Sequence, residues 1–506
     1  MKINGVHVVP LLLAAILLVS GGCETSLEGQ LNDNLPPTTN LTVDQINRTG
    51  EARLSSQINI SWWGDDPDGF LKGFEVAVND TANSAWTFTT RNDSTFILPI
   101  PTGNDTADVT FFVRAVDNDD ARDPNPASLV FPIKNSTPEV RFKRNPLPPE
   151  KKQIPPDSTF SIASFGWRLS DEDGVENIAT TEIALNPPDG EWVEIPVEET
   201  FISIKAENQT NSVTNANLFL GTAFRSTDLL LDDLRINAEN AFAVRVTDQA
   251  GAVSQPDTVR WYVRQQTSNI LFLQDDASVS APSSLEFHLS QLNDIGLSVD
   301  VWDISDGFAE RGQSVNLSEN LPAVIDPTLK KTLAEWDHIY WFSNSLNRNI
   351  NFAQEITSDF VDNGGTVFVN IPAIRLQSNS ALLDFLAIER QAQLPSLGTG
   401  FALANNSEIR TLNSIGSTPS LSTDRIITGI VPFQPIAGAE ALLESDFFVT
   451  LVTGQVETFD DFGNIAVKNQ EGNLIYLGMD LQDLNGNNNL PELLESMLID
   501  ELGFNE

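Results

Sequence analysis

The chain contains very few of the side chains that thiol and imidazole chemistry require. One of its 506 residues is cysteine and three are histidine. A single cysteine cannot form an intrachain disulfide or supply a cysteine zinc cluster. His288 and His338 lie beyond the N-terminal segment, and neither accompanies a serine in a Gly-x-Ser-x-Gly context. We interpret both as structural residues, so neither a Ser-His-acid triad nor a transition-metal site is indicated.

Basic residues are also scarce. Lysine and arginine number 29 against 70 aspartates and glutamates, which gives a formal net charge of -41. A surface this acidic repels phosphate groups, which argues against nucleic acid and anionic lipid as partners. The acidic residues are spread along the whole chain, a pattern typical of a solvated surface and of a saline habitat. The hydrophobic fraction of 41% is that of a chain with buried cores, so wholesale disorder and a polytopic membrane protein are excluded.

Residues 1–22 have the form of an export signal. Lys2 precedes an apolar run at residues 8–19, which is too short to span a membrane but suits the core of a signal peptide. The Ser-Gly-Gly-Cys ending at residues 20–23 resembles the lipobox of bacterial lipoproteins, although Ser20 stands where that family usually has leucine. The resemblance implies that the signal is removed and that Cys23 is lipidated. The alternative is an ordinary secretory signal with an incidental cysteine.

Lipidation of Cys23 implies a membrane partner through the acyl chains. Residues 23–40 are polar and contain Pro36-Pro37, which predicts a flexible tether after the lipid anchor. We therefore expect an exported protein that is lipid-anchored in the bacterial envelope, at the outer membrane or cell surface. Short motifs such as Asp80-Thr81-Ala82 are similar to the O-glycosylation signal of Bacteroidota envelope proteins.

Residues 41–265 carry two copies of one β-rich pattern. Alternating apolar runs separated by turn clusters occupy the first copy at residues 58–63, 73–78, 94–98 and 110–116. The segment at 63–69 is echoed at 167–174, and the strand at 112–117 is echoed at 243–248. The repetition predicts two β-sandwiches, at residues 41–135 and 136–265.

The shared landmarks are a tryptophan strand, an Asp-x-Asp-Gly corner and a late Val-Arg-Ala-x-Asp strand. They resemble those of bacterial fibronectin type III-like and related immunoglobulin-like modules. The resemblance implies a fold but leaves the function open, because adhesive, spacer and carbohydrate-associated domains share it. The second copy has an insertion at residues 206–232 with apolar segments, which predicts packing on a neighbour, with ligand contact as the alternative.

Acidic residues gather in two loops of the first copy. Asp65, Asp66 and Asp68 follow its tryptophan strand, and Asp117 and Asp119 end its late strand. In such sandwiches both loops lie at the same end, and calcium requires six to eight oxygen ligands. The pattern predicts a structural calcium site, the one cofactor that we consider. The alternative is that these residues form tight turns through their own backbone hydrogen bonds.

From residue 268 onward, strands and helices alternate. Predicted strands lie at residues 270–273, 297–303, 338–343, 366–371 and 472–481, and predicted helices at 283–296, 352–363 and 490–502. The alternation predicts an α/β parallel-sheet three-layer domain over residues 268–506. The order of elements, with the segments at 336–341 and 360–366, resembles the flavodoxin-like core of class I glutamine amidotransferase-like domains.

The C-terminal domain departs from that family at its catalytic position. Active amidotransferases place a nucleophilic cysteine on a glycine-flanked elbow and pair it with histidine. This domain has no cysteine, and its strand at 366–371 leads into Pro372. Glutamine amidotransferase activity is therefore excluded.

Polar residues mark the carboxyl ends of the predicted strands. Asp275, Asp276, Asp303 and Asn370 occupy the crevice where ligands of open α/β sheets bind, so they form a candidate ligand site. The alternative is a solvated strand end that caps the following helix. No phosphate loop follows the first strand, so a nucleotide is not indicated.

These patterns predict a lipid-anchored, noncatalytic envelope protein that binds or assembles with an unidentified protein or glycan partner. We assign it no catalytic residues. One alternative is a carboxylate-based envelope hydrolase, for example on glycans, with the sandwiches as accessory modules; another is a structural surface-layer component. The hydrolase requires a deep pocket that holds two carboxylates with perturbed pKa values.

Overall fold

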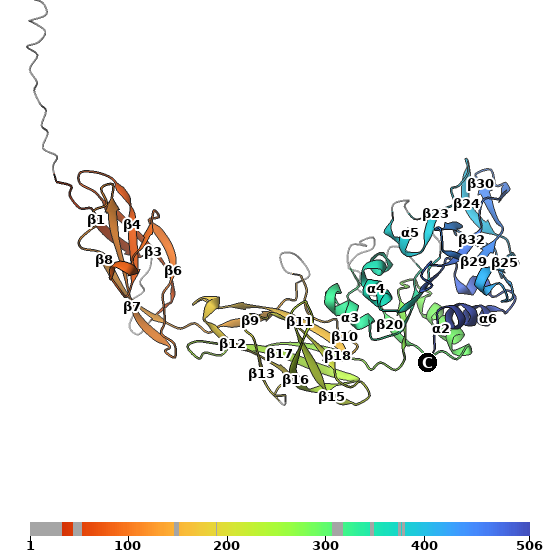
Figure 1. Ribbon diagram of the computed structural model, residues 1–506, viewed down its shortest axis with the longest axis horizontal. Coiled ribbons are helices and arrows are strands. Elements are labelled where there is room, and N and C mark those ends of the chain that lie inside the picture. The colour runs from red at the N-terminus through yellow and green to blue at the C-terminus, as the bar shows by residue number, and fades with distance from the viewer. Residues whose placement is uncertain are drawn as a thin grey trace, which may run out of the picture. The chain divides into compact units, whose positions relative to one another are not determined.

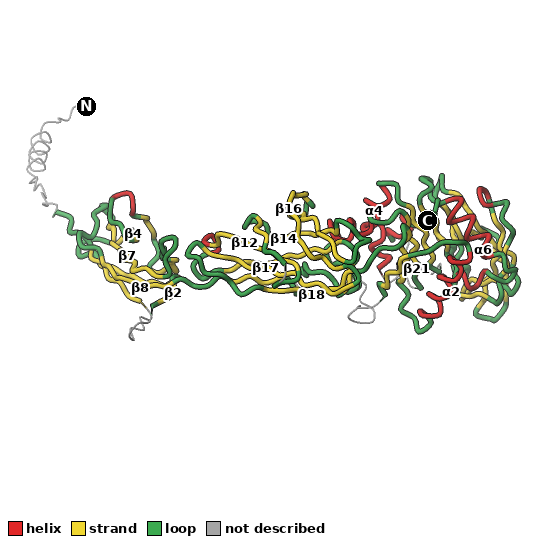
Figure 2. Tube along the Cα trace, turned by 90° about the horizontal axis from the view of Figure 1, so that it is seen from below, coloured by secondary structure: helices red, strands yellow, loops and turns green. Residues whose placement is uncertain are grey.

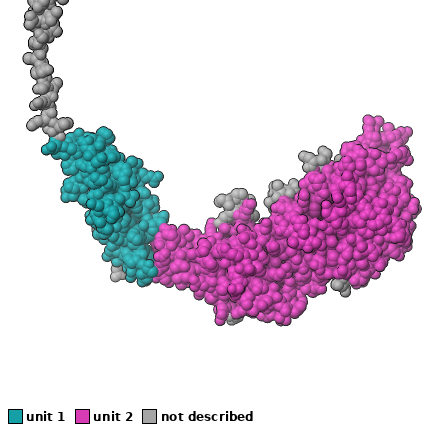
Figure 3. Space-filling model, in the orientation of Figure 1, with its two compact units in different colours: residues 1–135 teal, residues 136–506 magenta. Residues whose placement is uncertain are grey.

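The computed structural model describes residues 33–43, 53–145, 151–188, 190–305, 317–344, 349–372, 376 and 380–505. The predicted export signal and Cys23 lie outside these residues. The chain divides into two compact units, Met1–Asn135 and Ser136–Glu506 (Figure 3). Strands dominate the chain up to residue 263, and nearly all helices belong to the C-terminal part (Figure 2). None of the helices in the described residues combines the length and apolar character needed to cross a membrane.

The first unit is a two-sheet β-sandwich. One sheet has the order β1-β3-β6, and the other has the order β2-β8-β7-β4-β5. The strands are β1 (Thr38–Val43), β2 (Leu54–Ser55), β3 (Gln57–Asp65), β4 (Leu71–Val78), β5 (Thr87–Thr89), β6 (Asp93–Ile97), β7 (Thr106–Asp117) and β8 (Ala127–Lys134), with a 3₁₀ turn η1 (Asn83–Ala85). Strand β1 begins inside the range predicted as a tether, because it pairs in full with β3. The tether prediction of 23–40 is therefore wrong from Thr38 onward.

The period of two in the sequence builds this sandwich. Along β7, Val109, Phe111, Val113 and Ala115 are buried at alternate positions, since successive strand residues point to opposite faces. These side chains meet Trp62 of β3, which is 2% exposed, in one hydrophobic cluster made only of residues of this unit. The first unit therefore has a core of its own.

The second sandwich opens the second unit and repeats the same order with two added strands. Its sheets run β10-β18-β17-β12-β13 and β16-β15-β14-β11-β9. The strands are β9 (Glu139–Phe142), β10 (Ser158–Thr159), β11 (Ile162–Ser170), β12 (Ile178–Leu185), β13 (Val193–Ile195), β14 (Phe201–Ala206), β15 (Val213–Leu220), β16 (Arg225–Arg235), β17 (Ala238–Asp248) and β18 (Asp257–Val263), with η2 (Val175–Asn177).

The predicted insertion at 206–232 is the hairpin of β15 and β16. It extends the sheet of β11 and β14, and its buried Leu218 and Leu231 join the core of its own sandwich. At its tip, Phe219 stacks on Phe224, whose ring lies 5.9 Å from Nζ of Lys331 in the C-terminal domain. The insertion therefore packs mainly on its own module and reaches the neighbouring domain through the tip.

The C-terminal domain contains five neighbouring parallel strands in the order β20-β19-β21-β22-β33. These are β19 (Ile270–Gln274), β20 (Asp300–Asp303), β21 (His338–Phe342), β22 (Thr366–Asn370) and β33 (Leu474–Leu477). The helices are α2 (Ala281–Asp294), η3 (Ile325–Leu329), α3 (Lys330–Leu333), η4 (Asn349–Phe352), α4 (Ala353–Asp362), α5 (Ala381–Phe385), η6 (Leu481–Leu484), α6 (Leu490–Leu494) and η7 (Glu495–Glu501).

Helices cover both faces of the parallel strands (Figure 1). Phe272 of β19 joins a hydrophobic cluster with residues of α2 and α6, and the adjacent Leu271 joins a second cluster with residues of α3 and α4. All five residues of β19 are buried, as expected for a strand covered on both sides. The carboxyl ends of these strands share one edge, where the candidate ligand site was predicted.

An antiparallel extension, which we did not predict, follows β22. From β33 the large sheet continues through β32, β29, β25 and β26. Strand β28 also pairs with β32, and β23 pairs with β28. A separate sheet has the order β27-β24-β30-β31. These strands are β23 (Ile388–Gln391), β24 (Gly398–Leu403), β25 (Glu408–Thr411), β26 (Leu421–Ser422), β27 (Ile427–Thr428), β28 (Phe433–Pro435), β29 (Glu440–Ser445), β30 (Phe447–Leu451), β31 (Val456–Phe459) and β32 (Asn464–Lys468), with η5 (Asn413–Ile415).

Candidate functional site

The carboxyl edge of the parallel strands gathers the predicted polar residues. Asp275 and Asp276 follow β19, Asp303 ends β20 and Asn370 ends β22. Asp480 follows β33 at the same edge, and we did not single it out from the sequence. Its position directly after a closing apolar strand was the available signal.

Asp275 is buried and holds three strand ends together. Asn349 Nδ2 donates to Asp275 Oδ1 at 2.8 Å, and Trp341 Nε1 donates to Asp275 Oδ2 at 3.4 Å. The hydroxyl of Ser343 donates to the Asp275 carbonyl at 3.1 Å, and Asn349 Nδ2 also donates to the carbonyl of Ile304. The Asp275 carboxylate therefore accepts internal hydrogen bonds from Trp341 of β21 and from Asn349, and Asn349 extends this network to Ile304 after β20.

Asp276 and Asp303 each stabilise a local turn. Asp276 is 1% exposed, and its two oxygens accept from Ser278 N at 2.8 Å and Ser278 Oγ at 3.0 Å. Asp303 is exposed, and its Oδ1 accepts from Ser305 N at 2.9 Å and Ser305 Oγ at 2.6 Å. Both are turns of the type that aspartate forms with the backbone two residues onward.

Asn370 joins two strand ends rather than the acidic residues. Its Nδ2 donates to the carbonyls of Leu477 and Met479 at 3.1 and 2.8 Å, while its buried Oδ1 lacks a hydrogen-bond donor. The four predicted residues thus share an edge of the sheet, but each serves a different set of hydrogen bonds.

One pair of carboxylates at this edge interacts electrostatically. Burial raises the pKa of Asp480, and the nearby charge of Asp276 raises it further, while the Gln482 backbone amide and Arg425 act in the opposite direction. Arg425 Nη2 lies 2.5 Å from Oδ1 of Asp483, so this edge also carries an ion pair. The arrangement places a carboxyl group with raised pKa beside a buried carboxylate.

The two histidines occupy core positions. His288 of α2 is fully buried among aromatic rings, its Nδ1 lies 2.9 Å from the hydroxyl of Tyr340, and burial lowers its pKa to about 3. His338 of β21 bonds Thr366 Oγ1 at 2.7 Å through Nδ1 and stacks on Phe504, and burial lowers its pKa. Both are neutral at physiological pH, as structural histidines are.

The predicted calcium residues of the first unit are only partly brought together. Burial and the charges of Asp68 and Asp117 raise the pKa of Asp66, while a hydrogen bond from the Asp68 backbone acts in the opposite direction. Asp117 accepts from the amides of Asp119 and Ala121 at 2.9 and 2.8 Å, as expected for a tight turn. Asp65 and Asp119 contribute main-chain groups here: the Asp119 amide donates to Asp117, and the Asp65 carbonyl accepts from Thr38 Oγ1 at 3.3 Å.

The second sandwich has an acidic corner at the corresponding place, formed by residues 171–173 after its tryptophan strand. Asp171 has a buried Oδ2 without a donor, and burial together with repulsion from Asp173, Asp248 and Glu172 raises its pKa. Within the part of the chain that the structure describes, no group of three or more histidine, cysteine or acidic side chains is arranged to hold a metal ion. Calcium at Asp65, Asp66, Asp68, Asp117 and Asp119 stays a prediction.

Each sandwich also carries a Trp-Arg-Glu stack that sequence reasoning missed. The guanidinium carbon of Arg114 lies 4.0 Å from the ring centroid of Trp86, and Arg114 forms an ion pair with Glu75 at 2.7 Å. In the second sandwich, Arg245 lies 4.2 Å from the Trp192 ring and pairs with Glu182 at 2.8 Å. The repeated Val-Arg strand carried this signal. Both tryptophans are half-buried and lie outside the cores.

The second sandwich and the C-terminal domain share a buried junction. Phe160 of the sandwich is 2% exposed, and its ring meets Trp336 edge-on at 4.7 Å and Trp302 at 5.5 Å. Lys205 Nζ pairs with Glu335 Oε1 at 2.6 Å. Phe160 thus belongs to a hydrophobic cluster of the C-terminal domain rather than to that of its own sandwich.

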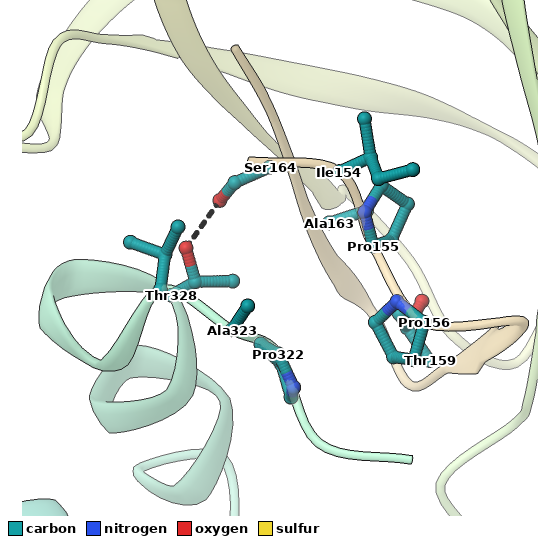
Figure 4. A pocket seen from close by; sticks show the side chains of 10 residues that line it. Ile154, Pro155, Pro156, Thr159, Ala163, Ser164, Pro322, Ala323 and Thr328 are labelled. Carbon is teal, nitrogen blue, oxygen red and sulfur yellow. Dashed lines mark hydrogen bonds between the residues drawn. The ribbon is translucent and has the colours of Figure 1, made fainter. Parts of the chain in front are cut away.

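A small cavity lies within this junction. Figure 4 shows Ile154, Pro155 and Ala163 on the sandwich side, opposite Pro322 and Thr328, and the hydrogen bond from Thr328 Oγ1 to Ser164 Oγ at 2.7 Å. The volume is about 10 Å³, which is room for about one water molecule. The cavity is a packing feature and not a ligand site.

Comparisons with known proteins give structural likenesses. No protein-family model matches the chain, and no curated protein matches it significantly. Among solved structures, similarity is found to the fibronectin(III)-like modules of CbhA from Clostridium thermocellum, with 14% identity, a TM-score of 0.17, and coverage of 44% of this chain and 94% of that chain. A segment of two fibronectin type III domains from chicken tenascin gives 10% identity, a TM-score of 0.21, and coverage of 46% and 99%. Both likenesses are to fibronectin type III modules. The description of the two sandwiches given above rests on the strand order of their sheets.

Proposed function

We propose that the chain is a noncatalytic binding or assembly protein of the bacterial cell envelope, anchored by a lipidated Cys23. In this proposal the first sandwich is a spacer, and the second sandwich with the C-terminal domain is the binding unit. The C-terminal domain, which resembles amidotransferase-like domains, serves in this proposal as a scaffold and does not carry out glutamine hydrolysis. The observation that carries the proposal is the use of Asp275, Asp276, Asp303 and Asn370 in internal hydrogen bonds that stabilise strand ends and turns.

The buried junction supports the assignment of one binding unit. Phe160, Trp302 and Trp336 pack together across it, and Glu335 accepts from Lys205 and Ser161 of the sandwich. Burial of these three rings opposes independent movement of the second sandwich and the C-terminal domain, because separation would expose the rings to water. A binding surface that spans the junction would therefore keep its geometry.

Anchoring is tested by metabolic labelling of the full chain with an alkynyl fatty acid in a bacterial host. We expect the wild type to incorporate the label and to partition into the detergent phase, and Cys23→Ser to do neither. Ser20→Leu, which restores the usual lipobox residue, is the matched control and should label at least as strongly. Equal labelling of the Cys23→Ser protein would contradict the anchor.

The hydrolase alternative has one observation in its favour, the pair of Asp276 and the raised-pKa carboxyl group of Asp480. Two such carboxyl groups are what acid-base cleavage of a glycosidic bond uses. Residues 24–506 are incubated with isolated envelope glycans, and new reducing ends are measured. The noncatalytic proposal predicts no release above a heat-denatured control. Release that Asp276→Asn and Asp480→Asn both abolish, with the melting temperature unchanged, would establish the hydrolase instead.

A further inference from the structure

A wide cleft opens where the second sandwich meets the C-terminal domain. Its volume is about 420 Å³, within the range of about 300–1,000 Å³ that is typical of small-molecule sites. The lining residues are Gln209 from the turn between β14 and β15, residues 266–269 of the linker between β18 and β19, and Ser298 before β20. Every lining side chain is an amide or a hydroxyl, and none is charged.

Asp300 fixes the linker that forms one wall. The backbone amides of Thr267 and Ser268 donate to its carboxylate at 3.0 and 3.2 Å, and Thr267 Oγ1 donates at 2.7 Å. Trp336 Nε1 donates to the same carboxylate at 3.0 Å. Asp300 is 6% exposed, so these charge-assisted hydrogen bonds are shielded from water and hold the wall in one conformation.

Glu335 fixes the amide side chains on the other side. Gln266 Nε2 donates to the Glu335 carbonyl at 2.7 Å, and Gln209 Nε2 donates to Glu335 Oε2 at 3.4 Å and to Gln266 Oε1 at 3.3 Å. These bonds assign the amide orientations, because each nitrogen faces an acceptor. The cleft is therefore preorganised by residues of both domains.

Two acceptors of the lining lack donors. Oε1 of Gln209 and Oδ1 of Asn269 are buried and have no hydrogen-bond partner. A buried carbonyl oxygen without a donor is unfavourable, and a ligand that supplies O–H donors to these two oxygens relieves that cost.

We propose that this cleft binds a neutral saccharide. Sugar hydroxyls both donate and accept, which matches a lining of amides and hydroxyls, and the volume accommodates one or two sugar rings. An anionic ligand is disfavoured by Asp300 and Glu335 behind the walls. A cation is disfavoured because Lys205 and the hydrogen bonds described above already meet those two carboxylates. The inference rests on the proposed binding function and names its ligand class.

The test is titration calorimetry and saturation-transfer NMR on residues 24–506 with maltose, cellobiose, lactose and chitobiose. Glucosamine and cellobiuronic acid serve as the cationic and anionic probes. We expect at least one neutral disaccharide to bind with an affinity about threefold to tenfold weaker in Gln209→Ala and Asn269→Ala, the loss expected for one hydrogen bond. Ser298→Tyr, which places a ring in the cleft, should abolish binding. Gln455→Ala, on an exposed turn after β30, is the matched control and should bind as the wild type does.

Unchanged affinity in the two alanine variants and in Ser298→Tyr overturns the proposal, as does the lack of binding by every neutral probe at 10 mM. Binding of glucosamine or cellobiuronic acid alone overturns it in favour of a charged ligand. Thermal melts of each variant separate loss of binding from loss of folding. The labelling of Cys23 is measured independently, so failure of the cleft and failure of the envelope assignment remain distinguishable.

Discussion

Single residues show how burial decides the state of ionisable groups in this acidic chain. His288 is neutral because the surrounding rings exclude water, and burial together with neighbouring carboxylates raises the pKa of Asp171. The positions of Asp275, Asp276 and Asn370 at one sheet edge follow from strand order and could be predicted from the sequence. Their partners could not, because Asn349 reaches Asp275 from 74 residues away, and no local pattern reports such a hydrogen bond.

His288 makes the chain sensitive to acid. Its pKa falls from 6.5 in the unfolded chain to about 3 in the folded chain, so between these values the unfolded state binds the extra proton and stability falls as the pH falls. The loss approaches about 1.4 kcal/mol per pH unit. We expect the free energy of unfolding of His288→Gln to fall less steeply than that of the wild type between pH 6 and pH 4 in urea titrations. Parallel slopes for the two proteins would contradict the assignment.

Asp171 has the opposite effect. Its folded pKa is raised, so the native state binds the proton more tightly than the unfolded state, and stability rises as the pH falls through that pKa. We expect Asp171→Asn to raise stability at pH 7 by about 0.5 kcal/mol, a small value because solvent screens the part-buried carboxylate. The gain should shrink toward pH 4 in thermal melts. Asp228→Asn, at an exposed position of β16, is the control, and an equal gain there would refute the role of the acidic corner.

Elements with a long, regular pattern were predictable, and the short irregular ones were not. The predicted strand at 110–116 is β7, and the predicted helix at 352–363 is α4 at Ala353–Asp362. Between residues 386 and 468 the strands have two to six residues and no α-helix separates them, so neither a period of two nor an alternation of strand and helix marks them. The antiparallel extension therefore depends on contacts between distant segments. The closing helix similarly divides into α6 and η7.

Phe160 is the aromatic side chain that the second sandwich contributes to the hydrophobic cluster of the C-terminal domain, beside polar contacts such as Lys205–Glu335. Truncation of a buried phenylalanine costs about 3–5 kcal/mol. We expect Phe160→Ala to expose the linker at residues 264–269, which limited proteolysis and mass spectrometry would detect as a new cleavage there. Phe70→Ala is the matched control, because Phe70 is 68% exposed in the first unit. Wild-type resistance of the linker in Phe160→Ala would show that polar contacts alone hold the junction.

Charge is a property of the whole molecule, and 70 acidic residues face 29 basic ones. Repulsion among like charges opposes the compact state, and salt shortens its range from about 10 Å at 0.1 M to about 3 Å at 1 M. We expect the melting temperature of residues 24–506 to rise as sodium chloride increases from 0.1 to 1 M. A variant with Glu457→Gln, Asp460→Asn and Asp461→Asn, all at exposed positions, should show a smaller rise. A melting temperature that falls with salt would show that ion pairs outweigh repulsion.

The packing of Phe160 in the hydrophobic cluster of the C-terminal domain has a consequence for recombination between the modules of this chain. The first sandwich keeps every residue of its hydrophobic cluster within residues 41–133, so recombination at the boundary after Asn135 transfers a self-sufficient cassette. A crossover in the linker at 264–269 instead separates Phe160 from its packing partners Trp302 and Trp336. Exchange of the first sandwich therefore leaves the other hydrophobic clusters intact, whereas the second sandwich and the C-terminal domain must be transferred together to keep Phe160 in its cluster.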